Sequence, residues 1–143
     1  MARVSGGTTY GRVGVSRTWA VVVGVGLLLL AAADAVGGSK GIKVTGHTVF
    51  MSATGLVAIY AALGIAALVS ALFGEVAVKL VLRAIGVALV ALVGVGIAAR
   101  ASMGQALGFP TKIPMAINLV NLFAAVAVLA ISFAAARLTY AAD

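Results

Sequence analysis

Four long stretches of the chain contain no Asp, Glu, Lys or Arg, and this spacing of charges limits the possible folds more than any other feature. The stretches lie between charged residues at positions 17 and 34, 43 and 75, 83 and 100, and 112 and 137. A bilayer strongly disfavours charge in its hydrocarbon core, so the charged residues of membrane proteins gather at the ends of the spanning segments. The pattern therefore predicts four membrane-spanning helices.

The composition is typical of a membrane environment. Of the 143 residues, 64% are hydrophobic and 9% are charged, whereas about 25% of the residues in a soluble domain are charged. Four helices of about 20 residues each use more than half of the chain and leave no segment for a separate water-soluble core. We therefore predict an all-α, polytopic membrane protein, a four-transmembrane-helix bundle with no soluble domain.

The charges and the turn-forming residues divide the chain into segments. A polar, basic arm of residues 1–17 is expected before the bundle of residues 18–138, and a short tail of residues 139–143 after it. The segments 37–47 and 100–112 are expected to be loops, since they are rich in glycine and polar residues. The four predicted spans cover about residues 18–38, 48–73, 76–99 and 113–136.

The basic residues predict orientation and contact with lipid. The net charge is +7, but the ten Lys and Arg residues are dispersed along the chain, so we expect contact with a membrane surface and no nucleic-acid partner. Six of the ten fall on the side of the two termini, which favours cytoplasmic N- and C-termini. Glu75 and Lys79 are spaced as a favourable helix pair. The residues expected to contact lipid head groups are Arg17, Lys79, Arg83 and Arg137.

Small residues recur at helical spacing in at least three of the four predicted spans. In a bilayer, such a row lets another helix backbone approach closely, which is how helices associate where lipid removes the hydrophobic driving force. The row can serve packing within a four-helix bundle or assembly with other subunits, and both alternatives stay open. The residues expected to pack helices are Ala58, Ala62, Ala66, Ser70 and Gly74 in the second span, and Gly86 and Gly94 in the third.

Polar residues inside the predicted spans gather near one surface. Polar groups within a membrane are expensive and are therefore candidates for function. By helix rise, six of them fall in the non-cytoplasmic leaflet: Asp34, Ser52, Thr54, Tyr60, Asn118 and Asn121. One interpretation is a shallow pocket for a cation, a lipid head group or a partner helix. The other is that Asp34 pairs locally with Lys40 or Lys43 and that the Asn side chains hold helices together.

The chain carries few residues that support catalysis or cofactor binding. It has no Cys, one His and three carboxylates, so we expect no metal site, no thiol chemistry and no catalytic residues. Haem ligation by His47 or Met51 would need a second axial ligand from another helix, because these two residues share one face. We therefore expect no cofactor and no enzyme activity.

Two functions remain as expectations. The first is a structural or accessory membrane subunit, packed through small-residue helix faces into a larger assembly with other membrane subunits or with copies of itself. The alternative is a small oligomeric transporter or channel that uses the polar residues of the non-cytoplasmic leaflet. An ion-coupled transporter usually has an ionisable residue at mid-membrane or an interrupted helix, and Asp34 lies near the end of its span. The residue usage suggests a prokaryotic cell membrane, with a viral membrane or envelope as the other setting.

Overall fold

The computed structural model describes nearly the whole chain. The described residues are 8–37, 41–50, 53–109 and 113–140, and those at 8–15, 48–50 and 135–140 are described by their backbone alone. They form five helices and one β-hairpin: α1 (Thr8–Gly37), β1 (Ile42–Val44), β2 (His47–Phe50), α2 (Thr54–Ser70), α3 (Glu75–Ala98), α4 (Arg100–Leu107) and α5 (Met115–Tyr140).

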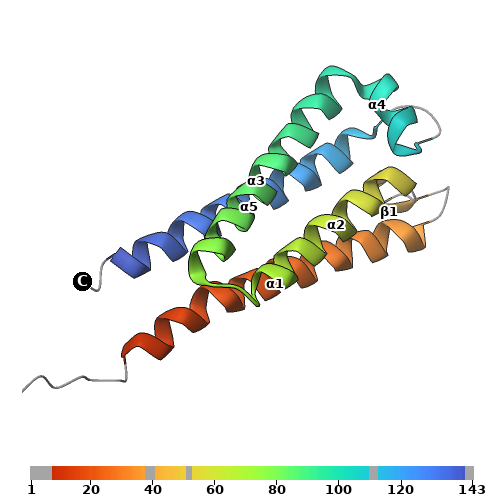
Figure 1. Ribbon diagram of the computed structural model, residues 1–143. Helices are drawn as coiled ribbons and strands as arrows, with labels where there is room; N and C mark the ends of the chain where they lie inside the picture. The colour runs from red at the N-terminus through yellow and green to blue at the C-terminus, as the bar shows by residue number, and fades with distance from the viewer. Residues whose placement is uncertain (1–7, 38–40, 51–52, 110–112, 141–143) are drawn as a thin grey trace, which may run out of the picture.

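The four longer helices form two antiparallel pairs. Helix α1 packs along α2, and α3 packs along α5, with fewer contacts between the pairs (Figure 1). The start of α1, the α2–α3 turn and the end of α5 lie at one end of the bundle, which we call the terminal end. The β-hairpin and α4 lie at the other end, which we call the hairpin end.

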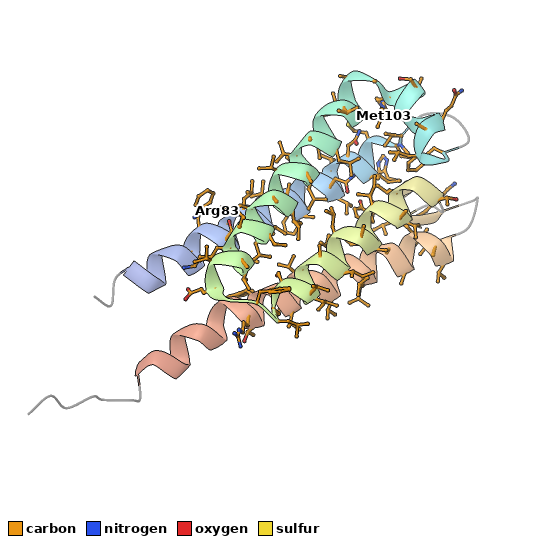
Figure 2. The ribbon with its side chains drawn as sticks, viewed as in Figure 1. Arg83 and Met103 are labelled. Atoms are coloured by element: carbon orange, nitrogen blue, oxygen red, sulfur yellow. The ribbon has the colours of Figure 1, made fainter. Side chains whose placement is uncertain are left out.

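Within the described residues, three helices are long and apolar enough to cross a membrane. Their candidate spans are Ser16–Gly37, Glu75–Ala98 and Met115–Ala134. Helix α2 is equally apolar but has only 17 residues, or about 25 Å at 1.5 Å per residue. Many large apolar side chains are exposed on the outside of the bundle, among them Leu80 and Phe123, and Figure 2 shows side chains of this kind along its length. The chain is therefore compatible with an integral membrane protein.

The start of the second predicted span is wrong, because residues 47–50 form a strand. Val44 pairs with His47 across a two-residue turn, and Lys43 pairs with Thr48. Both turn residues have positive φ, 50° at Thr45 and 82° at Gly46, as a hairpin turn of the primed type requires. The β-branched residues on either side favour extended backbone. The helix therefore begins at Thr54 and is six residues shorter at this end than predicted from position 48.

The predicted loop 100–112 contains a helix, α4. Its residues Ala, Met, Gln and Leu are good helix formers, and Gly108 ends the helix with a φ of 92°. The amide of Phe109 then donates to the carbonyl of Gly104 at 2.8 Å, as in a glycine-terminated helix. The Arg100 side chain donates to the carbonyl of Ile113 at 3.0 and 3.1 Å and fixes the return of the chain toward α5.

The predicted N-terminal arm is also helical in its described part. Helix α1 begins at Thr8, ten residues before the predicted start at 18, and Ser16 is buried. The Ser16 hydroxyl donates to the Glu75 carboxylate at 3.3 Å, which joins the start of the candidate span in α1 to the start of α3. Residues 1–7 and 141–143 lie outside the described residues.

Each helix pair has its own close contact. Gly24 of α1 faces Gly64 of α2, and a Cβ at Gly64 would lie 3.0 Å from the Gly24 carbonyl oxygen. In the other pair, Gly86 of α3 receives the Leu129 side chain of α5, which would lie 2.5 Å from an added Cβ. In the α1–α2 pair the close atoms include backbone, with the Gly64 carbonyl oxygen 2.9 Å from a Cβ added at Gly24, so a larger residue there would push the helices apart. In the α3–α5 pair the close atoms belong to the flexible Leu129 side chain, which can shift.

Candidate functional site

A hydrogen bond inside the bundle connects the two helix pairs. The Tyr60 hydroxyl of α2 donates to the Asn121 side-chain oxygen of α5, and both residues are buried. Tyr60 lies six residues after the start of α2 and Asn121 six residues after the start of α5. Both starts are at the hairpin end, so both side chains lie about 9 Å below it by helix rise.

A second buried asparagine connects α5 to α3. The Asn118 side-chain nitrogen donates to the carbonyl of Gly96 at 3.2 Å. A Cβ at position 96 would lie 2.5 Å from the Asn118 side-chain oxygen. Glycine at this position therefore makes room for the asparagine and gives it access to the α3 backbone.

Asp34 brings α1 into the same group. It is 2% exposed, lies three residues before the end of α1, and its carboxylate acts electrostatically on the Tyr60 hydroxyl. Asp34, Tyr60, Gly96, Asn118 and Asn121 thus come from all four long helices, and we call them the polar cluster. Of the other residues in the predicted group, Thr54 is exposed at the start of α2 and Ser52 lies outside the described residues.

The polar cluster has the properties of an interhelical contact. In the described part of the chain, every buried side-chain nitrogen or oxygen has a hydrogen-bond partner. Three or more His, Cys, Asp or Glu side chains that converge as metal ligands are not found among the described residues. In an apolar surrounding, hydrogen bonds between helices hold the bundle in one arrangement. Gly96 was missed in the sequence because one glycine among many gives no signal of the asparagine opposite it.

The predicted packing residues divide between the inside and the outside of the bundle. Gly86 is buried against α5, and Ser70 is buried with its hydroxyl bonded to the carbonyl of Ala67 at 2.7 Å. Gly94 and Gly74 are exposed, and nothing lies within 4 Å of a Cβ added to either. Three further residues, all on α2, are also exposed: Ala58, Ala62 and Ala66. The glycine that packs α2 against α1 is Gly64, which the fourth-residue spacing did not include.

The residues predicted to contact head groups lie toward the terminal end. Arg17 is exposed, and the predicted Glu75–Lys79 pair is confirmed as a salt bridge of 2.8 Å. The Arg83 guanidinium lies over the Phe133 ring of α5, 5.1 Å from its centroid. The Arg137 side chain is outside the described part of the chain.

His47 lies at a shallow pocket of the hairpin end. The pocket has a volume of about 350 Å³ and is formed by the hairpin turn and the start of α5: Val44, Thr45, His47, Met115, Ala116 and Leu119. Met51 lies outside the described residues. Four of the six lining residues are apolar.

In comparisons with known proteins, no protein-family model, no curated protein and no solved structure matches the chain. The internal polar cluster and the exposed small residues of α2 are therefore the features that bear on function.

Proposed function

We propose that this protein is a structural or accessory subunit of a membrane assembly, with four spanning helices, and that the outer face of α2 contacts another subunit. The observation that carries the proposal is the placement of Ala58, Ala62 and Ala66. These three residues are exposed on α2, although they are the type that membrane helices place against one another.

The charged residues support four spans. Counting 20 residues, or about 30 Å of helix, back from the hairpin end leads from Gly37 to Arg17 in α1 and from Ala98 to Val78 in α3, beside Lys79. The same count from Thr54 leads to Gly74 in the α2–α3 turn, where the exposed Leu72 and Phe73 extend the apolar length of α2. The same count from Met115 leads to residue 135 of α5, two residues before Arg137, so the four helices share one slab with charges at its terminal edge.

The outer face of α2 is a surface where a helix can approach closely. The inner face already has its partner, since Gly64 meets Gly24 of α1. By helical periodicity, Ala58, Ala62 and Ala66 lie beside the exposed Ile65 and Val69. Small residues next to large ones form a ridge and a depression that a second helix can fill by van der Waals packing. Lipid chains gain little van der Waals contact from such a surface.

The short length of α2 supports the same assignment. Its 17 helical residues span about 25 Å, so the turn residues Leu72 and Phe73, which are outside the helix, have to fill the rest of a hydrocarbon core about 30 Å thick. A short apolar helix is accommodated by bilayer thinning or by association with other helices. A neighbouring subunit that covers α2 shields this helix from a bilayer that is thicker than the helix is long.

The polar cluster supports a structural role, because its groups hydrogen-bond between helices. The alternative, a small oligomeric transporter or channel, would use Asp34 in that cluster. Substitution Asp34→Asn separates the two: in a structural role it changes the stability of the bundle, while in transport it abolishes ion flux in liposomes and leaves the assembly intact.

The mass of the native assembly tests the proposal. In mild detergent, the wild-type chain should elute in a complex larger than one chain, and Ala62→Leu should release it as a single chain. Overpacking by about 1–3 kcal/mol corresponds to about 5- to 150-fold weaker association. The matched control is Ala32→Leu, an exposed alanine on α1 among the large exposed residues Leu29 and Val36. A wild-type chain that elutes alone, or equal loss in both variants, would contradict the proposal.

A further inference from the structure

Arg83 is an exposed cation inside the apolar length of α3. It lies eight residues after the start of the helix at Glu75 and five residues inside the slab edge at Val78, which places its Cα about 8 Å below that edge. An arginine at this depth needs an anionic or polar partner, because its charge is costly beside hydrocarbon. Figure 2 shows Arg83 on the stretch of α3 that runs beside α5.

The described side chains supply an aromatic ring and no anion. The guanidinium lies over Phe133 at 5.1 Å from the ring centroid, an arrangement that holds it by a cation–π interaction. Glu75 is engaged with Lys79 at 2.8 Å and with Ser16, and Asp34 lies near the hairpin end of α1. The third acidic residue of the chain, Asp143, is outside the described residues.

Stacking on one face of the guanidinium leaves its edges for a ligand. The N–H groups lie in the plane of the guanidinium and form a fork that matches a phosphate. Phe133 is itself 54% exposed, so the pair is at the surface of the bundle. A chain with ten basic and three acidic residues attracts an anionic ligand from its surroundings.

The neighbouring residues match the tails of such a ligand. Val87 and Val90 follow Arg83 by one and two turns on the same face of α3, and Val126 precedes Phe133 by two turns on α5. All three valines are exposed. They lie deeper than Arg83 relative to the terminal end, because α3 and α5 are antiparallel. The phosphate position is therefore followed by an apolar surface in the direction that acyl chains take.

We propose that Arg83 and Phe133 form a binding site for an anionic phospholipid, in which the guanidinium binds the phosphodiester and the valines of α3 and α5 contact the acyl chains. Phe133 is a positioning residue that holds the guanidinium in place. The site depends on insertion in a membrane and is independent of the α2 surface, since it lies on the other helix pair.

Competition between two lipids tests the site. Native mass spectrometry of the purified protein with equimolar phosphatidylglycerol and phosphatidylcholine of identical chains should show about tenfold preferential retention of phosphatidylglycerol, the size of effect expected for one charge-assisted contact. Arg83→Gln should abolish the preference and Phe133→Leu should reduce it. Arg83→Lys, which keeps the charge and loses the fork, should give an intermediate value and remains informative if Arg83→Gln does not fold. Lys43→Gln, an exposed cation of the hairpin, is the matched control and should keep the preference.

Three results would overturn the proposal. Equal retention of the two lipids by the wild-type protein would exclude selectivity for the anionic head group. Displacement of phosphatidylglycerol by millimolar inorganic phosphate would assign the site to free phosphate. Unchanged lipid retention in Arg83→Gln, together with loss of the native assembly, would make Arg83 a contact of a partner protein.

Discussion

Helix α2 has small residues on two opposite faces, and only one of these faces is used within the chain. On the inner face, Gly64 brings the α2 backbone against Gly24 of α1. On the outer face, Ala58, Ala62 and Ala66 are exposed. The comparison shows that a row of small residues permits close packing of another helix but does not identify which helix packs there. The inner face stabilises the fold, and we propose that the outer face contacts another subunit.

The largest effect is expected from a change on the inner face. Gly64→Leu places a side chain where even a Cβ lies 3.0 Å from the Gly24 carbonyl and 3.0 Å from the Leu28 side chain. Overpacking of this kind costs about 3 kcal/mol and should unfold or rearrange the α1–α2 pair. Thermal unfolding in detergent, followed by circular dichroism, measures it. Gly26→Leu on α1, with open space around it, is the control and should unfold like the wild type. Equal stability of the two variants would show that the close contact is absent.

A smaller effect is expected from the hydrogen bond on the inner face. Tyr60→Phe removes the hydroxyl that binds Asn121 and should destabilise the bundle by about 1 kcal/mol, the size measured for bonds between membrane helices. A double-mutant cycle with Asn121→Leu isolates the interaction, since the loss in the double variant should be smaller than the sum of the single losses. Strict additivity would mean that the two side chains do not interact.

The smallest effect on the fold is expected from the outer face. Ala62→Leu adds volume at an exposed position, so the unfolding free energy of the isolated chain should change by no more than about 0.5 kcal/mol. The measurement is an unfolding titration in a detergent that keeps the chain monomeric. A loss similar to that of Gly64→Leu would remove the distinction between the two faces.

The sequence predicted the helical class and the apolar spans, because charge and hydropathy are properties of single segments. The β-hairpin was missed because its turn, Thr45-Gly46, depends on positive φ at a threonine, a residue that seldom adopts it. Helix α4 was missed because Ser102 and Gly104, which are weaker helix formers, lie inside it and Gly108 follows it.

The candidate site was predicted in part, and the rest depends on tertiary contacts. Polarity and helix rise were enough to place Tyr60 and Asn121 in the same leaflet, and the structure joins them. The packing row was misleading because each step of four residues advances by about 40° around a helix of 3.6 residues per turn. From Ala58 to Ser70 the row therefore turns by about 120°, which is why Ala58 is exposed and Ser70 is buried. Only the position of a neighbouring helix identifies Gly64 and Gly96 as contact points.

The central claim, that another protein covers the outer face of α2 in the membrane, is tested most directly by photo-crosslinking in native membranes. A compact diazirine amino acid replaces Ile65 on that face, 54% exposed, or Val126 on α5, 58% exposed. The two positions are equally accessible within the chain, so only their surroundings in the membrane differ. Illumination should produce protein adducts at position 65 and lipid adducts at position 126. Lipid adducts alone at both positions would contradict the claim.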